Sequence, residues 1–198
     1  MKSDCYHLFD TALGLCAIAW RESAGGGAVS RLQLPESTPA LTEQRIARIS
    51  GAARCQALPG AMAAAIETIK RHLGGELQDF REIPLDLTEV PGFDRAVYEA
   101  AMGIPAGQTR TYGEIAQLIS PAVQASFTSR GRSQQLPIAR AVGQALARNP
   151  IPILIPCHRV LAAKGRLGGF SAPGALLTKT KLLHIEGARF PGVLAFPA

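Results

Sequence analysis

The sequence lacks long apolar runs, closely spaced cysteines and a leader-like amino terminus. No apolar stretch approaches the roughly 20 residues needed to cross a membrane, and the first residues show no secretory pattern. We therefore expect a cytoplasmic protein without a membrane partner. The four cysteines are widely spaced and form no CxxC pair, which argues against a disulfide framework and against a zinc knuckle.

Charged residues are also scarce, at 18% of the 198 residues against 47% hydrophobic ones. This composition excludes a disordered chain and is typical of a globular protein. The length suffices for one substantial core or for two small domains.

Acidic residues are rare in the second half of the chain. Residues 1–92 carry 9 lysines and arginines against 11 acidic residues, whereas residues 93–198 carry 12 against 4. The resulting balance of +8 predicts a surface that binds a polyanion through phosphate contacts. A solvated basic face without a partner is the alternative that charge alone leaves open.

The first part of the chain predicts a small α/β domain over residues 1–88, because strands come first and helices follow that can pack on them. Residues 90–92 form the predicted linker. Cys5, His7, Cys16 and His72 show no metal-ligand spacing, so we expect packing roles for them. Strands are predicted over residues 6–20 as a hairpin, 28–34 and 83–87, and helices over 43–50, capped by Thr42, and 61–73.

The second part, residues 89–198, predicts a mainly helical domain. Helices are predicted over residues 93–102, 111–119 and 138–148. Thr111 and Glu114 have the spacing of a capping box at the start of the second helix. Short helices followed by an apolar, strand-like segment over residues 151–155 suggest a helix-turn-helix of the winged type.

One cysteine stands beside one histidine at Cys157 and His158. Three prolines restrict the apolar residues before them, so we expect a stiff, buried strand that delivers Cys157 at its end. A thiol needs a base to become a nucleophile, and His158 is the nearest candidate. Glu186 could orient that histidine, which would complete a Cys-His-acid set. A buried structural cysteine with a chance neighbour is the alternative.

The segment PCHRV at residues 156–160 resembles the active-site signature of the O6-alkylguanine-DNA alkyltransferases, also called methylated-DNA–protein-cysteine methyltransferases. The resemblance is strong over roughly the last hundred residues and loose over the first ninety. It includes, in family order, FDRAVY (93–98), GQTRTYG (107–113), ARAVG (139–143), NP (149–150), GGFS (168–171) and LLHIEG (182–187).

This resemblance implies a ribonuclease H-like amino-terminal domain, a winged helix-turn-helix carboxy-terminal domain and direct repair of double-stranded DNA that contains O6-alkylguanine. Glu186 would hold His158, which through a water would take the thiol proton. The Cys157 thiolate, favoured by a lowered pKa, would attack the alkyl carbon on the guanine oxygen. The thioether product cannot be hydrolysed, so each molecule would act once, as a monomer, without cofactor or metal.

The resemblance also implies roles for residues around the thiol. Tyr112 would help to rotate the target nucleotide and protonate the leaving guanine, and Arg140 would fill the gap left by the extruded base. Asn149 would link the third helix to the active-site turn. Further DNA or base contacts are expected from Gly113, Ala139, Ala141, Phe170 and Ser171. The family often has tyrosine in place of Phe170, so a hydroxyl contact is absent here while the stacking surface remains.

The clearest departure from the family is an 18-residue segment, residues 120–137, where family members have a short loop. A loop of this length is either mobile or functional. The sharper hypothesis is that its Arg130 and Arg132 add phosphate contacts.

Two other functions are considered. A lesion-binding protein that signals to other repair machinery would not need Cys157, since alkyltransferase-like proteins carry a different residue there. A hydrolase with a Cys-His-Glu triad would have no evident use for a basic helix-turn-helix.

Overall fold

The computed structural model describes residues 5–22, 26–124 and 137–190. The chain forms two compact units, which we describe separately. Unit 1 contains residues 1–89, 150–154 and 172–174, and unit 2 contains residues 90–149, 155–171 and 175–198. Together they give a mixed α/β fold. No helix within the described ranges is both long and apolar enough to span a membrane.

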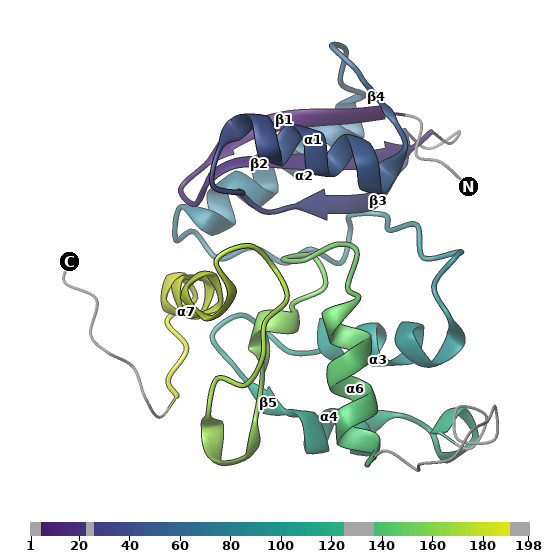
Figure 1. The fold of residues 1–198 in the computed structure, drawn as a ribbon, viewed down its shortest axis with the longest axis vertical. Helices are drawn as coiled ribbons and strands as arrows, with labels where there is room; N and C mark the ends of the chain where they lie inside the picture. Colours follow the sequence, from purple (N-terminus) through teal and green to yellow (C-terminus); the bar gives the residue numbers. More distant parts are fainter. Residues whose placement is uncertain (1–4, 23–25, 125–136, 191–198) are drawn as a thin grey trace. The chain divides into compact units, whose positions relative to one another are not determined.

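Unit 1 is built on a four-stranded sheet with the order β3-β2-β1-β4 (Figure 1). Strand β2 pairs antiparallel with both β1 and β3, and the short β4 pairs parallel with β1. The sheet has helices on both faces: Figure 1 shows α1 across its near face and the fainter α2 behind it. Residues 16–20 of β2 are therefore buried on both sides. The elements are β1 (Cys5–Thr11), β2 (Gly14–Arg21), β3 (Ala28–Gln33), α1 (Pro39–Ser50), β4 (Ala53–Arg54) and α2 (Gly60–Leu73).

The structure confirms the predicted hairpin, the third strand and the helix that ends at Leu73. The predicted start of α1 at residue 43 is wrong. The helix begins at Pro39 with Thr38 as its N-cap, whose side chain accepts a hydrogen bond from the Leu41 N–H at 3.3 Å. Proline at the first helical position has the right φ and needs no N–H partner, so the helix gains a turn. Thr42 lies buried inside it.

The predicted strand over residues 83–87 is also wrong. This segment makes only an isolated parallel bridge between Val29 and Leu85. The Val29 N–H donates to Pro84 O and the Asp86 N–H donates to Val29 O, each at 2.8 Å. Pro84 has no N–H with which to extend the ladder, so the pairing stops there.

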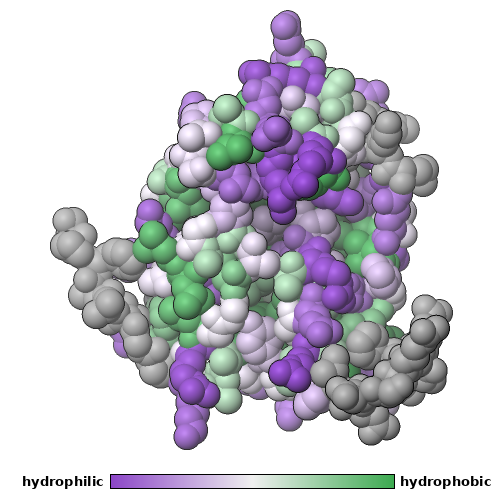
Figure 2. Space-filling view, in the orientation of Figure 1, coloured by the Kyte–Doolittle hydropathy of each residue, from purple (hydrophilic) through white to green (hydrophobic). Residues whose placement is uncertain are grey.

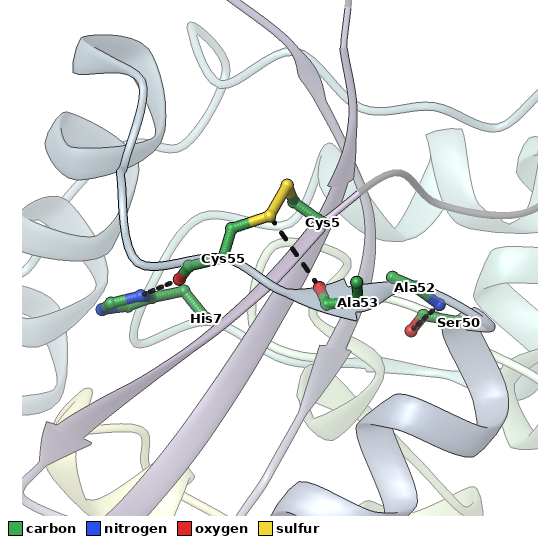
Figure 3. Close-up of a disulfide and its surroundings, with 6 residues drawn as sticks. All are labelled: Cys5, His7, Ser50, Ala52, Ala53 and Cys55. Carbon is green, nitrogen blue, oxygen red and sulfur yellow. Dashed lines mark hydrogen bonds between the residues drawn. A yellow bond between two sulfur atoms is a disulfide. The ribbon is translucent and has the colours of Figure 1, made fainter.

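A disulfide joins Cys5 and Cys55, whose Cα atoms are 5.5 Å apart (Figure 3). The cysteine spacing, which argued against a disulfide framework, did not predict this bond. The parallel pairing of β1 with β4 brings these residues together across 50 positions of sequence, and the Cys55 N–H donates to Tyr6 O at 3.0 Å. His7 Nδ1 lies 3.2 Å from the Cys55 carbonyl oxygen (Figure 3). Cysteine spacing carries no information on such a tertiary pairing.

Unit 2 is mainly helical. It contains α3 (Gly92–Met102), β5 (Arg110–Thr111), α4 (Tyr112–Leu118), α6 (Ile138–Ala147), the 3-10 turn η1 (Cys157–Arg159), β6 (Val160–Leu161), η2 (Ala163–Gly165) and α7 (Ala175–Ile185). Strands β5 and β6 pair in parallel. The predicted helices over residues 93–102, 111–119 and 138–148 are confirmed to within a few residues, and α4 has the predicted capping box between Thr111 and Glu114.

The segment over residues 151–155 is buried as expected, but it is not a strand. It makes a turn in which Ile153 has a φ of 75°. Pro150, Pro152 and Pro156 supply no N–H donors, so a continuous ladder cannot form across the segment. The stiffness inferred from these prolines therefore produces a buried turn.

Surface character differs among the helices, as Figure 2 shows. The near face of α1 in unit 1 is mostly hydrophilic with one smaller hydrophobic spot, whereas a hydrophobic stretch lies over α7 in unit 2. In the first turn of α7, Leu176 and Leu177 are 45% and 54% exposed. The core of unit 2 lies beneath, with Leu182 and Leu183 almost completely buried.

Candidate active site

Cys157 lies at the first position of η1 and lines a pocket in unit 2 with a volume of about 250 Å³. Its residue surface is 9% exposed, and its thiol is free. The pocket walls come from α4, from the second half of α6 and from the loop that follows η2. They are formed by Tyr112, Gly143, Leu146, Ala147, Gly169, Phe170 and Ser171. A small group on a larger ligand that enters this pocket would therefore lie beside Cys157.

His158 and Glu186 form a hydrogen-bonded pair in the interior of unit 2. His158 Nε2 lies 2.9 Å from Glu186 Oε1, and the side chains are 1% and 0% exposed. Glu186 directly follows the end of α7, and its carboxylate also accepts hydrogen bonds from Arg159. The structure thus brings together the predicted histidine and the predicted acid. The histidine is the residue that follows Cys157 in sequence.

Gly107 accounts for the close packing around Glu186. It has a φ of 78°, and a Cβ at this position would lie 2.9 Å from the Glu186 carbonyl oxygen. Any side chain there would push the 105–108 turn away from the end of α7. The glycine therefore allows the turn to pack directly against the residue that holds His158.

The thiol of Cys157 is less acidic than expected. Burial raises its pKa above the ordinary value, against the opposing effects of a hydrogen bond from the Asn149 side chain, the charge of Lys179 and two backbone N–H groups. The prediction of a lowered thiol pKa is wrong, because desolvation of the thiolate outweighs these contacts. In this conformation the sulfur is mainly a thiol, so it needs a base to become a nucleophile.

Lys179 is a buried cation beside the thiol, and no motif in the sequence indicated it. Its residue surface is 0% exposed, and its Nζ donates to Val160 O at 2.7 Å and to Gly169 O at 3.3 Å. Burial lowers its pKa to about 8, while the Cys157 thiolate acts in the opposite direction. One signal could have identified it: Lys179 shares a helix face with Leu182 and Leu183, three and four positions on.

Tyr112 lines the pocket, and the Asn149 side chain lies within hydrogen-bond reach of Cys157. Asn149 follows α6 and donates from Nδ2 to Ile155 O at 2.8 Å. Tyr112 opens α4, and its hydroxyl donates to Gly169 O at 3.4 Å. Burial and then the nearby Cys157 thiolate raise the tyrosine pKa, so it carries its proton. A Cβ on Gly168, whose φ is 67°, would lie 3.2 Å from the Tyr112 ring and hydroxyl.

The residues of α6 that were predicted to contact DNA differ in their exposure to solvent. Arg140 is exposed on the first turn, and Ala139 is half-buried. Ala141 is 1% exposed and belongs to the core of unit 2, so a DNA contact is not open to it in this conformation.

The other residues predicted to contact DNA lie outside α6. Gly113 is exposed at the start of α4, and Ser171 donates from Oγ to Ala147 O at 2.9 Å. Arg130 and Arg132 lie outside the described residues.

No three histidine, cysteine or acidic side chains in the described part of the chain converge closely enough to hold a metal ion.

Comparison with known proteins gives consistent matches. Residues 92–188 match the family model for the DNA binding domain of 6-O-methylguanine DNA methyltransferase. A Mycobacterium bovis methylated-DNA–protein-cysteine methyltransferase is 39% identical over 137 residues, which cover 69% of this chain and 72% of that protein. A DNA base-flipping protein of Thermus thermophilus is 37% identical over 130 residues, 65% of this chain and 76% of that protein. The crystal structure of Mycobacterium tuberculosis OGT in complex with DNA superposes with a TM-score of 0.66 at 30% identity, covering 95% and 96% of the two chains.

Proposed function

Since this chain belongs to the family of methylated-DNA–protein-cysteine methyltransferases, we propose that it repairs O6-alkylguanine in double-stranded DNA by moving the alkyl group onto Cys157. The observation that carries the proposal is the free thiol of Cys157 in the lining of a pocket, next in sequence to His158, which forms a buried pair with Glu186. The reaction needs no cofactor, because the thiol, the base and the proton donor all come from the chain.

The reaction proceeds in one displacement. His158 takes the proton of the Cys157 thiol, and the thiolate attacks the alkyl carbon while the bond from that carbon to the guanine oxygen breaks. The bonding electrons enter the guanine ring, which takes a proton from the Tyr112 hydroxyl and leaves neutral. His158 then releases its extra proton to solvent, and Tyr112 takes up a proton from solvent, so both side chains return to their starting states. A thioether remains on Cys157, so each molecule reacts once.

For the fold, we propose that unit 1 is ribonuclease H-like and that unit 2 is a winged helix-turn-helix. Helices α4 and α6 would form the helix pair, with β5 and β6 at the wing. We also propose that these are two domains, with the boundary between residues 88 and 89. The four-stranded sheet with helices on both faces supports the first assignment, and the packing of α4 against α6 supports the second.

For DNA binding, we propose that α6 enters the minor groove and that the target base leaves the duplex, because its oxygen cannot reach Cys157 from within the stack. The exposed Arg140 would occupy the vacated space, with Ala139 and Gly113 nearby. Phe170 and Ser171 would contact the flipped base from the pocket wall. We propose that the protein acts as a monomer. We place the reaction in the cytoplasm, where Cys157 stays a free thiol and the Cys5–Cys55 disulfide, which the reaction does not use, is open to reduction.

A second candidate function is recognition of the alkylated base without transfer. One observation favours it: burial raises the pKa of the Cys157 thiol, which reduces the thiolate available for attack. Such a protein would flip and hold the lesion for other machinery.

Intact-mass spectrometry separates these functions. The protein is mixed with a duplex that contains one O6-methylguanine, and Cys157→Ser and Cys16→Ser are the matched variants. Addition of one methyl group, mapped to Cys157, lost in Cys157→Ser and kept in Cys16→Ser, is the expected result. An unchanged mass with lesion binding retained would favour the second candidate.

A further inference from the structure

The Glu186 carboxylate has a second partner besides His158. Arg159 Nη2 donates to Oε1 at 2.7 Å, and Arg159 Nε donates to Oε2 at 3.0 Å and lies 3.2 Å from Oε1. We propose that Arg159 is a positioning residue for alkyl transfer, which acts through Glu186 to hold His158 in the tautomer that can accept the thiol proton. This inference rests on the proposed function.

The first step of the argument concerns charge. The Arg159 and Glu186 side chains are 7% and 0% exposed, and a guanidinium stays protonated in proteins. A buried cation of this kind requires an anion close by. Glu186 is therefore ionised, and an ionised carboxylate can only accept hydrogen bonds.

The second step concerns the histidine. Because Glu186 only accepts, the hydrogen between Glu186 Oε1 and His158 Nε2, which are 2.9 Å apart, belongs to the histidine. A neutral His158 then carries its proton on Nε2 and has its lone pair on Nδ1. Nδ1 is thus the nitrogen that can act as a base toward the neighbouring Cys157.

The third step concerns orientation. The planar arginine fork engages both carboxylate oxygens, and this fixes the rotation of the Glu186 side chain. Arg159 is itself anchored, since its Nη1 donates to Ile104 O at 2.6 Å beyond the end of α3. A lysine would keep the charge, but a single ammonium group cannot reproduce the fork. The arginine is therefore needed for geometry as well as for charge.

The test compares Arg159→Lys with wild type and with Arg21→Lys. Arg21 is a suitable control because it also pairs with a carboxylate, Asp86 Oδ2 at 2.8 Å, but belongs to unit 1. Three quantities are measured: the single-turnover rate of methyl transfer, the affinity for lesion DNA in a Cys157→Ser background, and the ¹⁵N chemical shifts of the His158 ring. A His158→Gln spectrum assigns the ring signals among the four histidines.

In wild type and Arg21→Lys we expect a His158 protonated on Nε2 only. In Arg159→Lys we expect ring shifts averaged between tautomers, transfer slowed by about 10²-fold, as a misplaced reacting group gives, and unchanged lesion affinity. Wild-type transfer in Arg159→Lys would overturn the proposal. Slow transfer with a wild-type His158 spectrum would also overturn it, because Arg159 would then have a structural role alone.

A second variant guards against misfolding. Arg159→Met leaves Glu186 as a buried charge without its arginine, so it is combined with Glu186→Gln to remove both charges. We expect this double variant to have a wild-type circular dichroism spectrum and slow transfer, and rapid transfer would contradict the inference. If wild type itself transfers no methyl group, the proposed function fails. The His158 spectra of wild type and Arg159→Lys then still decide the positioning role: a difference supports it and identity overturns it.

Discussion

His158 Nε2 and Glu186 Oε1 lie 2.9 Å apart, 28 positions apart in sequence and almost fully shielded from solvent. The pair is not isolated, because the same carboxylate also balances the charge of Arg159. A base, its orienting acid and a compensating cation thus form one buried unit beside the thiol. This arrangement makes the acid important for stability as well as for chemistry.

Replacing Glu186 with glutamine should therefore destabilise the protein strongly. The amide still accepts a hydrogen bond, but the buried Arg159 loses its anion, a change that typically costs about 3–5 kcal/mol. Urea unfolding followed by circular dichroism would measure the loss. The control is Glu114→Gln, which removes an exposed carboxylate of the same unit. Equal midpoints for the two variants would contradict the structure.

The reactivity of Cys157 should depend on pH in the direction set by its raised pKa. Labelling by iodoacetamide, followed by peptide mass spectrometry, should keep increasing with pH beyond the range in which an ordinary cysteine reaches its plateau. Asn149→Ala removes a hydrogen bond that favours the thiolate, so its labelling curve should move to still higher pH. A plateau below the ordinary cysteine range would refute this. Cys16, whose pKa is raised to about 11 by burial, serves as the internal comparison.

Lys179 should make stability depend on pH in a defined window. Its pKa is about 8 in the folded state and 10.5 ordinarily, so between these values the unfolded state binds more protons. Stability then rises with pH through the window, because the cost of burying the cation is full below pH 8 and disappears towards pH 10.5. The whole change is about 3 kcal/mol. In Lys179→Met this component is absent, so the unfolding free energy of the wild type minus that of the variant, measured by urea titration, should increase by about 3 kcal/mol as pH rises through this window.

The disulfide between Cys5 and Cys55 should stabilise unit 1 without serving the reaction. It closes a loop with a sequence separation of 50, for which the loss of chain entropy in the unfolded state corresponds to about 4 kcal/mol. Dithiothreitol should lower the thermal midpoint of the wild type. It should leave the midpoint of Cys5→Ser/Cys55→Ser unchanged and methyl transfer at 25 °C unaffected in both. A large loss of transfer on reduction would connect this bond to the active site.

The sequence by itself determined the elements that form through local hydrogen bonds. The hairpin of β1 and β2 and helices α2, α3, α4 and α6 could be predicted, because apolar periodicity, turn residues and the Thr111–Glu114 capping box act over a few positions. The adjacency of Cys157 and His158, with Glu186 downstream, also indicated the centre of the candidate site, because residue type and order suffice for it. Predictions from local propensity were wrong at three places that contain proline: the start of α1, residues 83–87 and residues 151–155.

Only the tertiary structure decided which distant groups meet and how deeply they are buried. It paired Arg159 with Glu186, placed Lys179 beneath the pocket wall and joined Cys5 to Cys55. It also reversed the expected shift of the thiol pKa and placed Ala141 in the core of unit 2. These properties depend on solvent exclusion and on contacts between residues far apart in the chain. Both arise only when the elements pack together, so residue type and spacing cannot specify them.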